Sequence, residues 1–151
     1  MKVLVFLIGP DRYALPLAMI ARVLPAIALK QVPLAPAFVA GLMDLYGEPV
    51  PVIDLSQLAG CAARQVWFDT RIILLDYRLP DGSTASLGLQ AEHVLGIETI
   101  DAATRRAPGV GGAPFLGQVA SAAGGMLQLV EVDALLPAQV RQLLFQPKAP
   151  A

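Results

Sequence analysis

The chain has 151 residues, of which 56% are hydrophobic and only 15% charged, and its formal net charge is −1. This composition excludes a disordered chain, and a chain of this length buries enough surface to fold without a disulfide or a metal. A nucleic-acid-binding domain would carry a basic stripe, whereas the longest basic cluster here is Arg105–Arg106. With so few charges, some exposed surface is expected to be apolar, as at protein-binding sites. A plain core whose apolar count is inflated by alanine and proline is the alternative.

The first residues do not have the pattern of a secretion signal. The apolar run Val3–Ile8 is shorter than a signal-peptide core and ends in Gly9-Pro10-Asp11-Arg12 without a small-residue cleavage site. No stretch approaches the ~18 apolar residues of a membrane helix. The single cysteine, Cys61, cannot form an internal disulfide. These features predict a soluble cytoplasmic protein.

In chain order, the first third of the sequence predicts short elements separated by turn residues. Val3–Ile8 and Tyr13–Leu17 predict a β-hairpin around the Gly-Pro turn. The apolar spacing of Leu17–Leu24 predicts one or two helical turns, which Pro25 closes. Ile27–Val32 is a further strand candidate, and Phe38–Leu42 is expected to be a short helical or bent segment.

The next segment, Glu48–Leu55, is expected to be extended. Its Pro49 and Pro51 lack the N–H that a strand ladder needs, which predicts a strand at a sheet edge or at a bulge. Asp54 is placed to cap a short helix over residues 55–59, and Gly60 can end that helix.

The second half predicts two more hairpins and a terminal helix. Arg71–Tyr77 predicts a central strand, and the Asp-Gly pair in Pro80–Ser83 predicts a tight turn before a returning strand. The remaining expected elements are strand Ser86–Glu92, strand Val94–Ile100 with a bulge at Gly96, a loop over 101–114, and the hairpin Phe115–Ser121 with Met126–Val132. Asp133 can cap the terminal segment, and a final helix begins near Pro137 with Val140, Leu143 and Leu144 as its buried stripe.

Many short strands with turns between them predict barrels or a sandwich. A weak internal repeat adds to this: the spacing of Phe38, Gly41 and Gly47 before an apolar strand is loosely matched by Phe115, Gly117 and Gly124. The sequence therefore predicts two similar small β subdomains.

The chain offers few residues for catalysis. The only histidine, His93, would need a nucleophile and an orienting acid nearby to act as a general base, and the sequence has no catalytic motif; a surface or strand-end role is the alternative. Asp44, Glu48 and Asp54 could form a paired acid/base site, but Asp54 already has a capping role. The glycine-rich residues 109–112 lack a lysine and a following helix start, so they are a weak phosphate site. An enzyme with a pocket near His93 or residues 44–54 and a nucleic-acid-binding barrel remain as alternatives.

The stretch VPLAPAFVAGLMDLYGEPVPVIDL, residues 32–55, resembles the signature of CheW-like chemotaxis adaptor domains. The matching positions are Pro33, Pro36, Phe38, Val39, Gly41, Leu42, Leu45, Gly47, Val50, Pro51, Ile53, Asp54 and Leu55. The opening hairpin, RIILLDY, the Gly88-Leu89 pair, HVLGI and the closing GMLQLVEVDALL are also similar, so the resemblance extends from about Lys2 to Leu144.

The resemblance implies an all-β (mainly β with short helices) fold of two small five-stranded SH3-like β-barrel subdomains that share a core, with a C-terminal helix. Residues 1–146 would form a single CheW-like domain and residues 147–151 a flexible tail. Such a domain is a non-enzymatic adaptor that couples the cytoplasmic hairpin tip of methyl-accepting chemoreceptors to the regulatory domain of a CheA-type histidine kinase. It implies no cofactor, metal, catalytic residue, nucleic acid or direct membrane insertion, and a cytoplasmic location at membrane-bound receptor arrays. A domain repurposed to cap or inhibit the kinase array is the alternative.

The resemblance also implies a receptor-facing groove, whereas it does not place the kinase-docking residues. The implied groove residues are Leu17, Ile20, Arg22, Val23, Tyr46, Ile72 and Ile73, with core packing as the alternative for the apolar ones. Two positions depart from the family pattern: Tyr46 stands where the family usually has arginine, and Arg22 where it often has glutamate. These side chains cannot make the same contacts, so the sequence predicts an adaptor for a divergent receptor.

Overall fold

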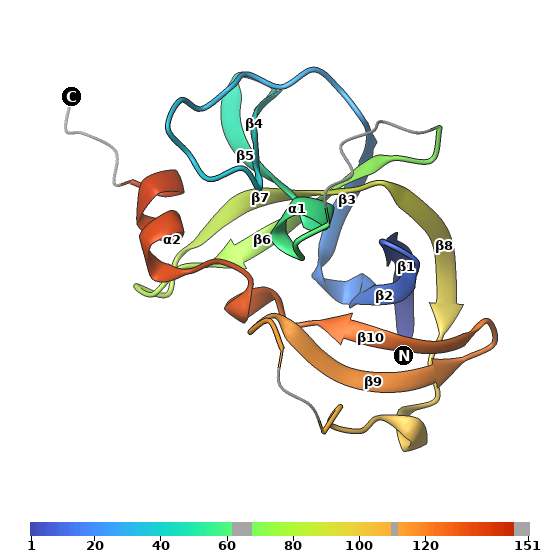
Figure 1. The fold of residues 1–151 in the computed structure, drawn as a ribbon. Helices are drawn as coiled ribbons and strands as arrows, with labels where there is room; N and C mark the ends of the chain where they lie inside the picture. The colour runs from blue at the N-terminus through green and yellow to red at the C-terminus, as the bar shows by residue number, and fades with distance from the viewer. Residues whose placement is uncertain (62–67, 110–111, 147–151) are drawn as a thin grey trace.

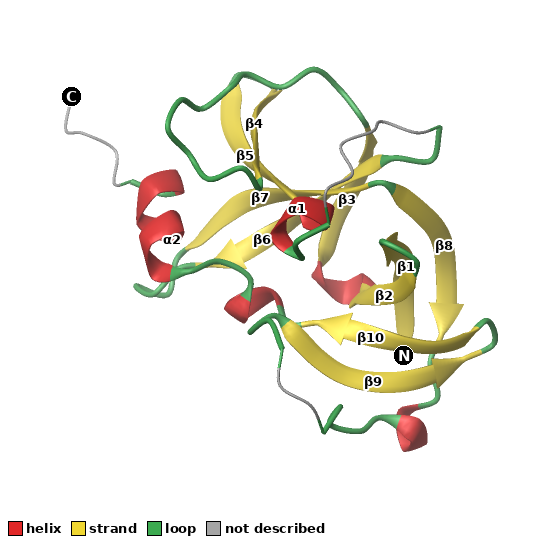
Figure 2. Cartoon of the chain, viewed as in Figure 1, coloured by secondary structure: helices red, strands yellow, loops and turns green. Residues whose placement is uncertain are grey.

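The computed structural model describes residues 1–61, 68–109 and 112–146, and its main elements are strands with short helices between them (Figure 2). The first sheet has the order β8-β1-β2-β10-β9 and the second the order β3-β6-β7-β5-β4 (Figure 1). We call the first sheet barrel 1 and the second barrel 2.

The bounds of the elements follow. Barrel 1 contains β1 (Lys2–Ile8), β2 (Asp11–Pro16), β8 (His93–Thr99), β9 (Leu116–Ala122) and β10 (Gly125–Val130). Barrel 2 contains β3 (Ile20–Pro25), β4 (Val39–Leu45), β5 (Glu48–Asp54), β6 (Arg71–Arg78) and β7 (Thr84–Ala91). The helices are α1 (Leu55–Leu58) and α2 (Ala138–Leu144), with 3₁₀ turns η1 (Leu17–Met19), η2 (Ala102–Thr104) and η3 (Val132–Ala134).

The two sheets have the same spatial connectivity. In each, an edge strand, β8 or β3, pairs antiparallel with the first strand of a hairpin, β1–β2 or β6–β7. The second strand of that hairpin runs parallel to β10 or β5, which pairs antiparallel with β9 or β4. After each edge strand the chain crosses to the far edge and makes one bridge there, Arg106 to Val119 or Lys30 to Leu42, which closes the sheet into a barrel.

This repeat extends to single hydrogen bonds. The Glu131 N–H donates to the Phe115 carbonyl at 2.7 Å, and the Asp54 N–H donates to the Phe38 carbonyl at 2.8 Å in the same place of the other barrel. The predicted internal repeat is therefore confirmed. Barrel 2 is built from one continuous stretch, whereas barrel 1 joins the N-terminal hairpin to three strands from the second half of the chain (Figure 1).

A single apolar cluster joins the two barrels. On β1, Val3 and Val5 point into barrel 1, while Leu4, Phe6 and Ile8 belong to this shared core. On β6, Ile72 and Leu74 point into barrel 2, while Ile73, Leu75 and Tyr77 belong to the shared core. Both strands are continuous apolar runs because both faces of each strand are buried.

Several local predictions are confirmed. Asp54 caps α1, because its carboxylate accepts from the Ser56 and Gln57 N–H groups at 3.0 and 3.3 Å. Gly60 follows α1 with a positive φ of 84°. The turn at residues 80–83 joins β6 and β7, with Gly82 at φ 87°. The β1–β8 pairing slips beside Gly96, as expected for a bulge.

Other predictions are wrong or hold only in part. The segment Leu17–Leu24 forms only the turn η1 and then strand β3, because pairing with β6 outweighs its helical spacing. Of the two alternatives for residues 38–42, the bent one holds: a turn at 37–38 leads into strand β4, which is bulged between Val39 and Gly41. Ile27–Val32 makes a single bridge rather than a strand. Leu143 is exposed on α2, whereas Val140 is buried and Leu144 partly buried. Asp133 lies within η3 and makes no capping hydrogen bond.

Strand β5 is not an edge strand, since it lies between β7 and β4. However, its ladder with β7 begins only at Val52, after both prolines. Pro49 and Pro51 therefore lie in the half of β5 that has a partner on one side only, which is where the missing N–H groups are tolerated. Among the described helices, none is long and apolar enough to span a membrane.

An ion pair closes the open end of barrel 1. The Arg12 guanidinium donates to both carboxylate oxygens of Glu98 at 2.8 and 2.7 Å, and the Gly124 N–H donates to the same carboxylate at 3.2 Å. The pair ties β2 to β8 across the intervening β1 and to the turn between β9 and β10. The hydrogen bonds from Arg12 hold the pKa of Glu98 below its usual value of 4.5, although desolvation opposes this shift.

We predict that Ile73→Ala lowers the free energy of unfolding by about 2–5 kcal/mol, because the lost side chain leaves a cavity in the shared core. Since this core joins both barrels, urea unfolding should stay a single transition, and amides of both barrels should lose hydrogen-exchange protection together. The matched control, exposed Thr99→Ala, should change stability by less than about 0.5 kcal/mol. Two separate transitions in Ile73→Ala would contradict the shared core.

We predict that Glu98→Gln destabilises the protein at pH 7 by about 1 kcal/mol or less, as expected for a partly exposed ion pair. Because the folded-state pKa of Glu98 is lowered, the stabilisation is present above the unfolded pKa and is lost as pH falls through the folded pKa. The stability difference between wild type and Glu98→Gln should therefore shrink below about pH 4.5 in urea titrations. A pH-independent difference would exclude this ion pair as its cause.

Candidate docking surface

The edge strands β3 and β8 hold equivalent places in the two barrels and carry the same irregularity. In β3 the pairing with β6 passes from Ile20 to Arg22 and skips Ala21. In β8 the pairing with β1 passes from Val94 to Gly96 and skips Leu95. Bulges of this kind protect a free strand edge from pairing with a foreign strand. Side chains, rather than backbone groups, are therefore what these edges offer to a partner.

Apolar side chains on β3 and β8 border the shared core. Val23 stands opposite Ile73, and Ile97 stands opposite Leu4, so both lie on the core-facing side of their sheets. They remain 41% and 59% exposed because each is on an edge strand. Leu17, Ile20 and Val94 are partly buried and pack against the same core. We call the set Leu17, Ile20, Val23, Val94 and Ile97 the apolar rim.

The sequence-predicted groove residues fall into three groups. Leu17, Ile20 and Val23 lie on the apolar rim. Ile72 and Ile73 are both 0% exposed, one inside barrel 2 and the other in the shared core. A partner cannot touch these two side chains, so core packing, the alternative stated for them, holds instead of a groove position. Alternation along β6 buries one on each face.

Arg22 and Tyr46, the two departures from the family pattern, are in contact. Arg22 donates to the Tyr46 hydroxyl at 3.3 Å, and its guanidinium carbon lies 6.0 Å from the centre of the tyrosine ring. That distance is at the limit of a cation–π interaction. Within the described part of the chain, no carboxylate lies within salt-bridge distance of Arg22. The guanidinium of Arg22 therefore contacts an aromatic side chain and is exposed to solvent.

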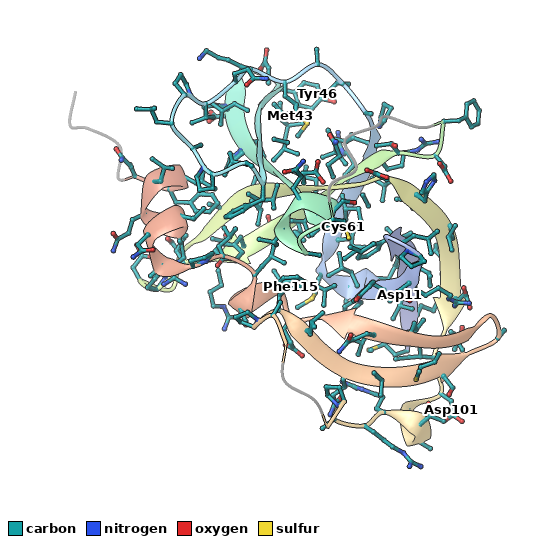
Figure 3. The ribbon with its side chains drawn as sticks, in the orientation of Figure 1. Asp11, Met43, Tyr46, Cys61, Asp101 and Phe115 are labelled. Carbon is teal, nitrogen blue, oxygen red and sulfur yellow. The ribbon has the colours of Figure 1, made fainter. Side chains whose placement is uncertain are left out.

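A strained turn presents Tyr46. The tyrosine lies between β4 and β5 at the outer end of barrel 2 (Figure 3), and it is 87% exposed. Tyr46 and Gly47 have positive φ values of 51° and 86°, as in a type I′ hairpin turn. Asp44 accepts from the Gly47 N–H at 2.7 Å and fixes the turn. A tyrosine in this conformation costs about 1 kcal/mol or more, which is typical of positions kept for an interaction.

Sequence reasoning missed Val94 and Ile97. Both lie in the segment 94–100 that was expected to be a strand, but nothing in its own pattern separates a rim residue from a core residue. The internal repeat is the feature that could have identified these two rim residues. Because β8 is equivalent to β3, Val94 and Ile97 occupy the places of Ile20 and Val23.

The candidate catalytic residues have structural partners and are dispersed. His93 Nδ1 lies 2.7 Å from the Asp69 carboxylate, and the Val94 N–H donates to the Asp69 carbonyl at 3.0 Å, which joins β8 to the segment before β6. Asp54 caps α1, while Asp44 accepts within its own turn. In the described ranges, no three His, Cys, Asp or Glu side chains gather as a metal site would need. Residues 110 and 111 of the glycine-rich segment, and the predicted tail 147–151, lie outside the described residues.

Comparison with known proteins agrees with this architecture. Residues 2–140 match the family described as the CheW-like domain. A segment of 70 residues is 33% identical to the chemotaxis protein CheW of Helicobacter pylori (strain ATCC 700392 / 26695), and it covers 46% of this chain and 42% of that relative. The chain therefore matches less than half the length of this curated relative.

A solved structure matches far more of the chain. The crystal structure of the scaffolding protein TtCheW from Thermoanaerobacter tengcongensis superposes with a TM-score of 0.80 at 25% sequence identity. The match covers 92% of this chain and 94% of that one, so the paired barrels and their connections are shared along nearly the whole length. Because the family match spans almost the entire described chain, the protein belongs to the CheW-like domain family.

Proposed function

We propose that this protein is a non-enzymatic adaptor that couples chemoreceptor-type proteins to a CheA-type histidine kinase at the cytoplasmic side of membrane-bound receptor arrays. Membership of the CheW-like family supports this function. The observation that carries it is the apolar rim, which leaves Val23 and Ile97 exposed along the line where the two barrels meet. Exposed apolar side chains bordered by polar surface are typical of protein-docking sites.

The apolar rim fits a helical partner better than an extended one. Both edge strands are bulged, which opposes strand addition, and the rim offers aliphatic side chains from two sides of one core. A helical hairpin presents apolar side chains at i, i+3 and i+4, which can pack between two such rows. We therefore assign the rim to the receptor hairpin tip, with Arg22 and Tyr46 beside it on β3 and the neighbouring turn.

The coupling function is tested by mixing three purified components: this chain, the receptor tip and the kinase regulatory domain of a candidate signalling system, with the kinase itself added for activity. Binding to both partners, together with receptor control of the kinase only when the chain is present, is the expected result. Binding to the kinase alone would instead indicate a domain that caps or inhibits the kinase array. Binding to neither would refute the proposal.

We predict that Val23→Glu weakens binding to the receptor tip by more than about tenfold, because it places a charge in an apolar contact. The fold should persist, since Val23 is exposed on an edge strand. The affinity for the kinase regulatory domain should stay within about twofold of wild type. Calorimetry with each partner measures both effects.

The matched control is Met126→Glu, which introduces the same charge at an exposed apolar residue of β10, away from the rim. This variant should bind the receptor tip as wild type does. Equal loss of receptor binding in both variants would mean that the effect is not specific to the rim.

We predict that the double substitution Arg22→Glu with Tyr46→Arg changes receptor preference. It restores the residue types usual at these positions in the family and reverses the sign of the charge on β3, and partner choice depends on such charges. Competition between receptor tips that differ in charge is the measurement. An unchanged preference would show that Arg22 and Tyr46 do not select the receptor.

A further inference from the structure

Each barrel contains a fork where its parallel strand pair separates. In barrel 2 the β5–β7 ladder covers only Val52–Asp54 with Gly88–Gln90, although β7 begins at Thr84 and β5 at Glu48. In barrel 1 the β10–β2 ladder covers only Gln128 and Leu129 with Tyr13 and Ala14. Thr84–Leu87 of β7 pairs with β6 on one side, and among the described residues no strand pairs with it on the other. Backbone groups of a strand point alternately to its two neighbours, so half of those in this stretch face the fork.

The repeat shows which residues correspond in the two forks. Ala14 pairs with both Val5 and Leu129, and Gly88 pairs with both Leu74 and Val52 at the same place of the other barrel. Two residues earlier on each strand, Arg12 of barrel 1 therefore corresponds to Ser86 of barrel 2.

Barrel 1 fills its fork with its own arginine. Arg12 lines the cleft there, which has a volume of about 270 Å³, and its guanidinium is fixed by Glu98 and packs against Gly124. An alanine at position 124 would collide with this guanidinium, so Arg12 is in close contact with the turn between β9 and β10. The residue at the fork of barrel 1 is thus an arginine whose guanidinium is held by a carboxylate of the edge strand β8.

Barrel 2 leaves its fork open. Ser86 is too short to fill the space, and the cleft between β5, β7 and the end of α2 has a volume of about 660 Å³. Pro49 and Pro51 line one wall, and because they have no N–H, β5 cannot close the gap with donors of its own. Phe145 forms another wall and is held by stacking on Tyr77, with ring centres 5.6 Å apart.

The charge of the open cleft favours a cationic occupant. Its lining includes the carboxylates of Glu48 and Asp81, and no lysine or arginine is among the described lining residues. Asp81 accepts from the Ser83 N–H and hydroxyl, which keeps its carboxylate oriented at the cleft. A free strand edge beside carboxylates and an aromatic wall fits an extended peptide with a basic side chain.

We propose that the cleft between β5, β7 and α2 docks an extended segment of a partner protein, which adds to the free edge of β7 and places an arginine beside Glu48. The arginine would lie at the fork equivalent to that of Arg12. However, its carboxylate would be Glu48 of β5, because the position equivalent to Glu98 is Leu24 in β3. This site is separate from the apolar rim, so it goes beyond the proposed receptor contact.

The test uses isotope-labelled full-length protein and an acetylated, amidated hexapeptide of alternating threonine and valine with one central arginine. In NMR titrations, the expected amide shifts are confined to the cleft: Leu79–Leu87, the non-proline residues of β5 and the end of α2 at Leu144–Gln146. The same peptide with glutamate in place of arginine should bind at least about tenfold more weakly, because it lacks the charge-assisted hydrogen bonds. Equal affinities of the two peptides, shifts elsewhere, or no binding at millimolar peptide would overturn the proposal.

Two variants in the cleft, each with a control variant outside it, test whether the peptide binds there. Ser86→Arg should fill the cleft as Arg12 fills its fork and abolish peptide binding, whereas Thr99→Arg on exposed β8 should not. Glu48→Lys should weaken arginine-peptide binding by at least about tenfold, and Asp133→Lys, an exposed acid outside the cleft, should leave it unchanged. Glu48→Lys keeps the test decisive if Ser86→Arg does not fold.

A truncated variant tests whether the chain's own C-terminus competes for the cleft. Removal of residues 147–151 should leave peptide affinity unchanged. Peptide binding that occurs only after this removal would show that the cleft belongs to the chain's own tail, which would overturn the proposal. Because neither receptor nor kinase is present in these titrations, failure here leaves the coupling function untouched.

Discussion

The double burial of β1 and β6 is the constraint on which the rest of the structure depends. Each strand sends alternate side chains into its own barrel and into the core that the barrels share. A separated barrel would expose Phe6 and Leu4 on one side or Ile73 and Leu75 on the other. A five-stranded barrel of this size has a small core of its own, so the shared cluster supplies much of the apolar burial that folding requires.

The docking surface follows from the same constraint. A core between two barrels must end somewhere, and it ends at the edge strands β3 and β8, where Val23 and Ile97 remain exposed. The bulges at Ala21 and Leu95 keep these edges from pairing with other strands. The chain can therefore keep an apolar surface for partners at β3 and β8 without offering these two edges for strand addition.

The two barrels share a plan but differ at their ends. Arg12 and Glu98 close barrel 1, whereas the equivalent fork of barrel 2 has Ser86 and stays open. Barrel 2 instead displays the Arg22–Tyr46 pair at its outer end, where the tyrosine is held in a strained turn. The two barrels thus share their strand arrangement. The different residues at equivalent positions, Arg12 and Ser86, determine which barrel end is closed and which stays open to a partner.

The sequence by itself determined the family, the strand-rich fold, the cap at Asp54, the turn at Gly82 and the central strand β6, because each rests on local spacing or on a contiguous motif. It misjudged Leu17–Leu24, whose helical spacing lost to pairing with β6. It left open whether Ile72 and Ile73 line a groove or pack in the core, and the core encloses both. Only the tertiary structure brought Arg22 against Tyr46, matched β8 to β3 and left the fork of barrel 2 open. These features depend on contacts between residues far apart in the chain, and no local pattern encodes such contacts.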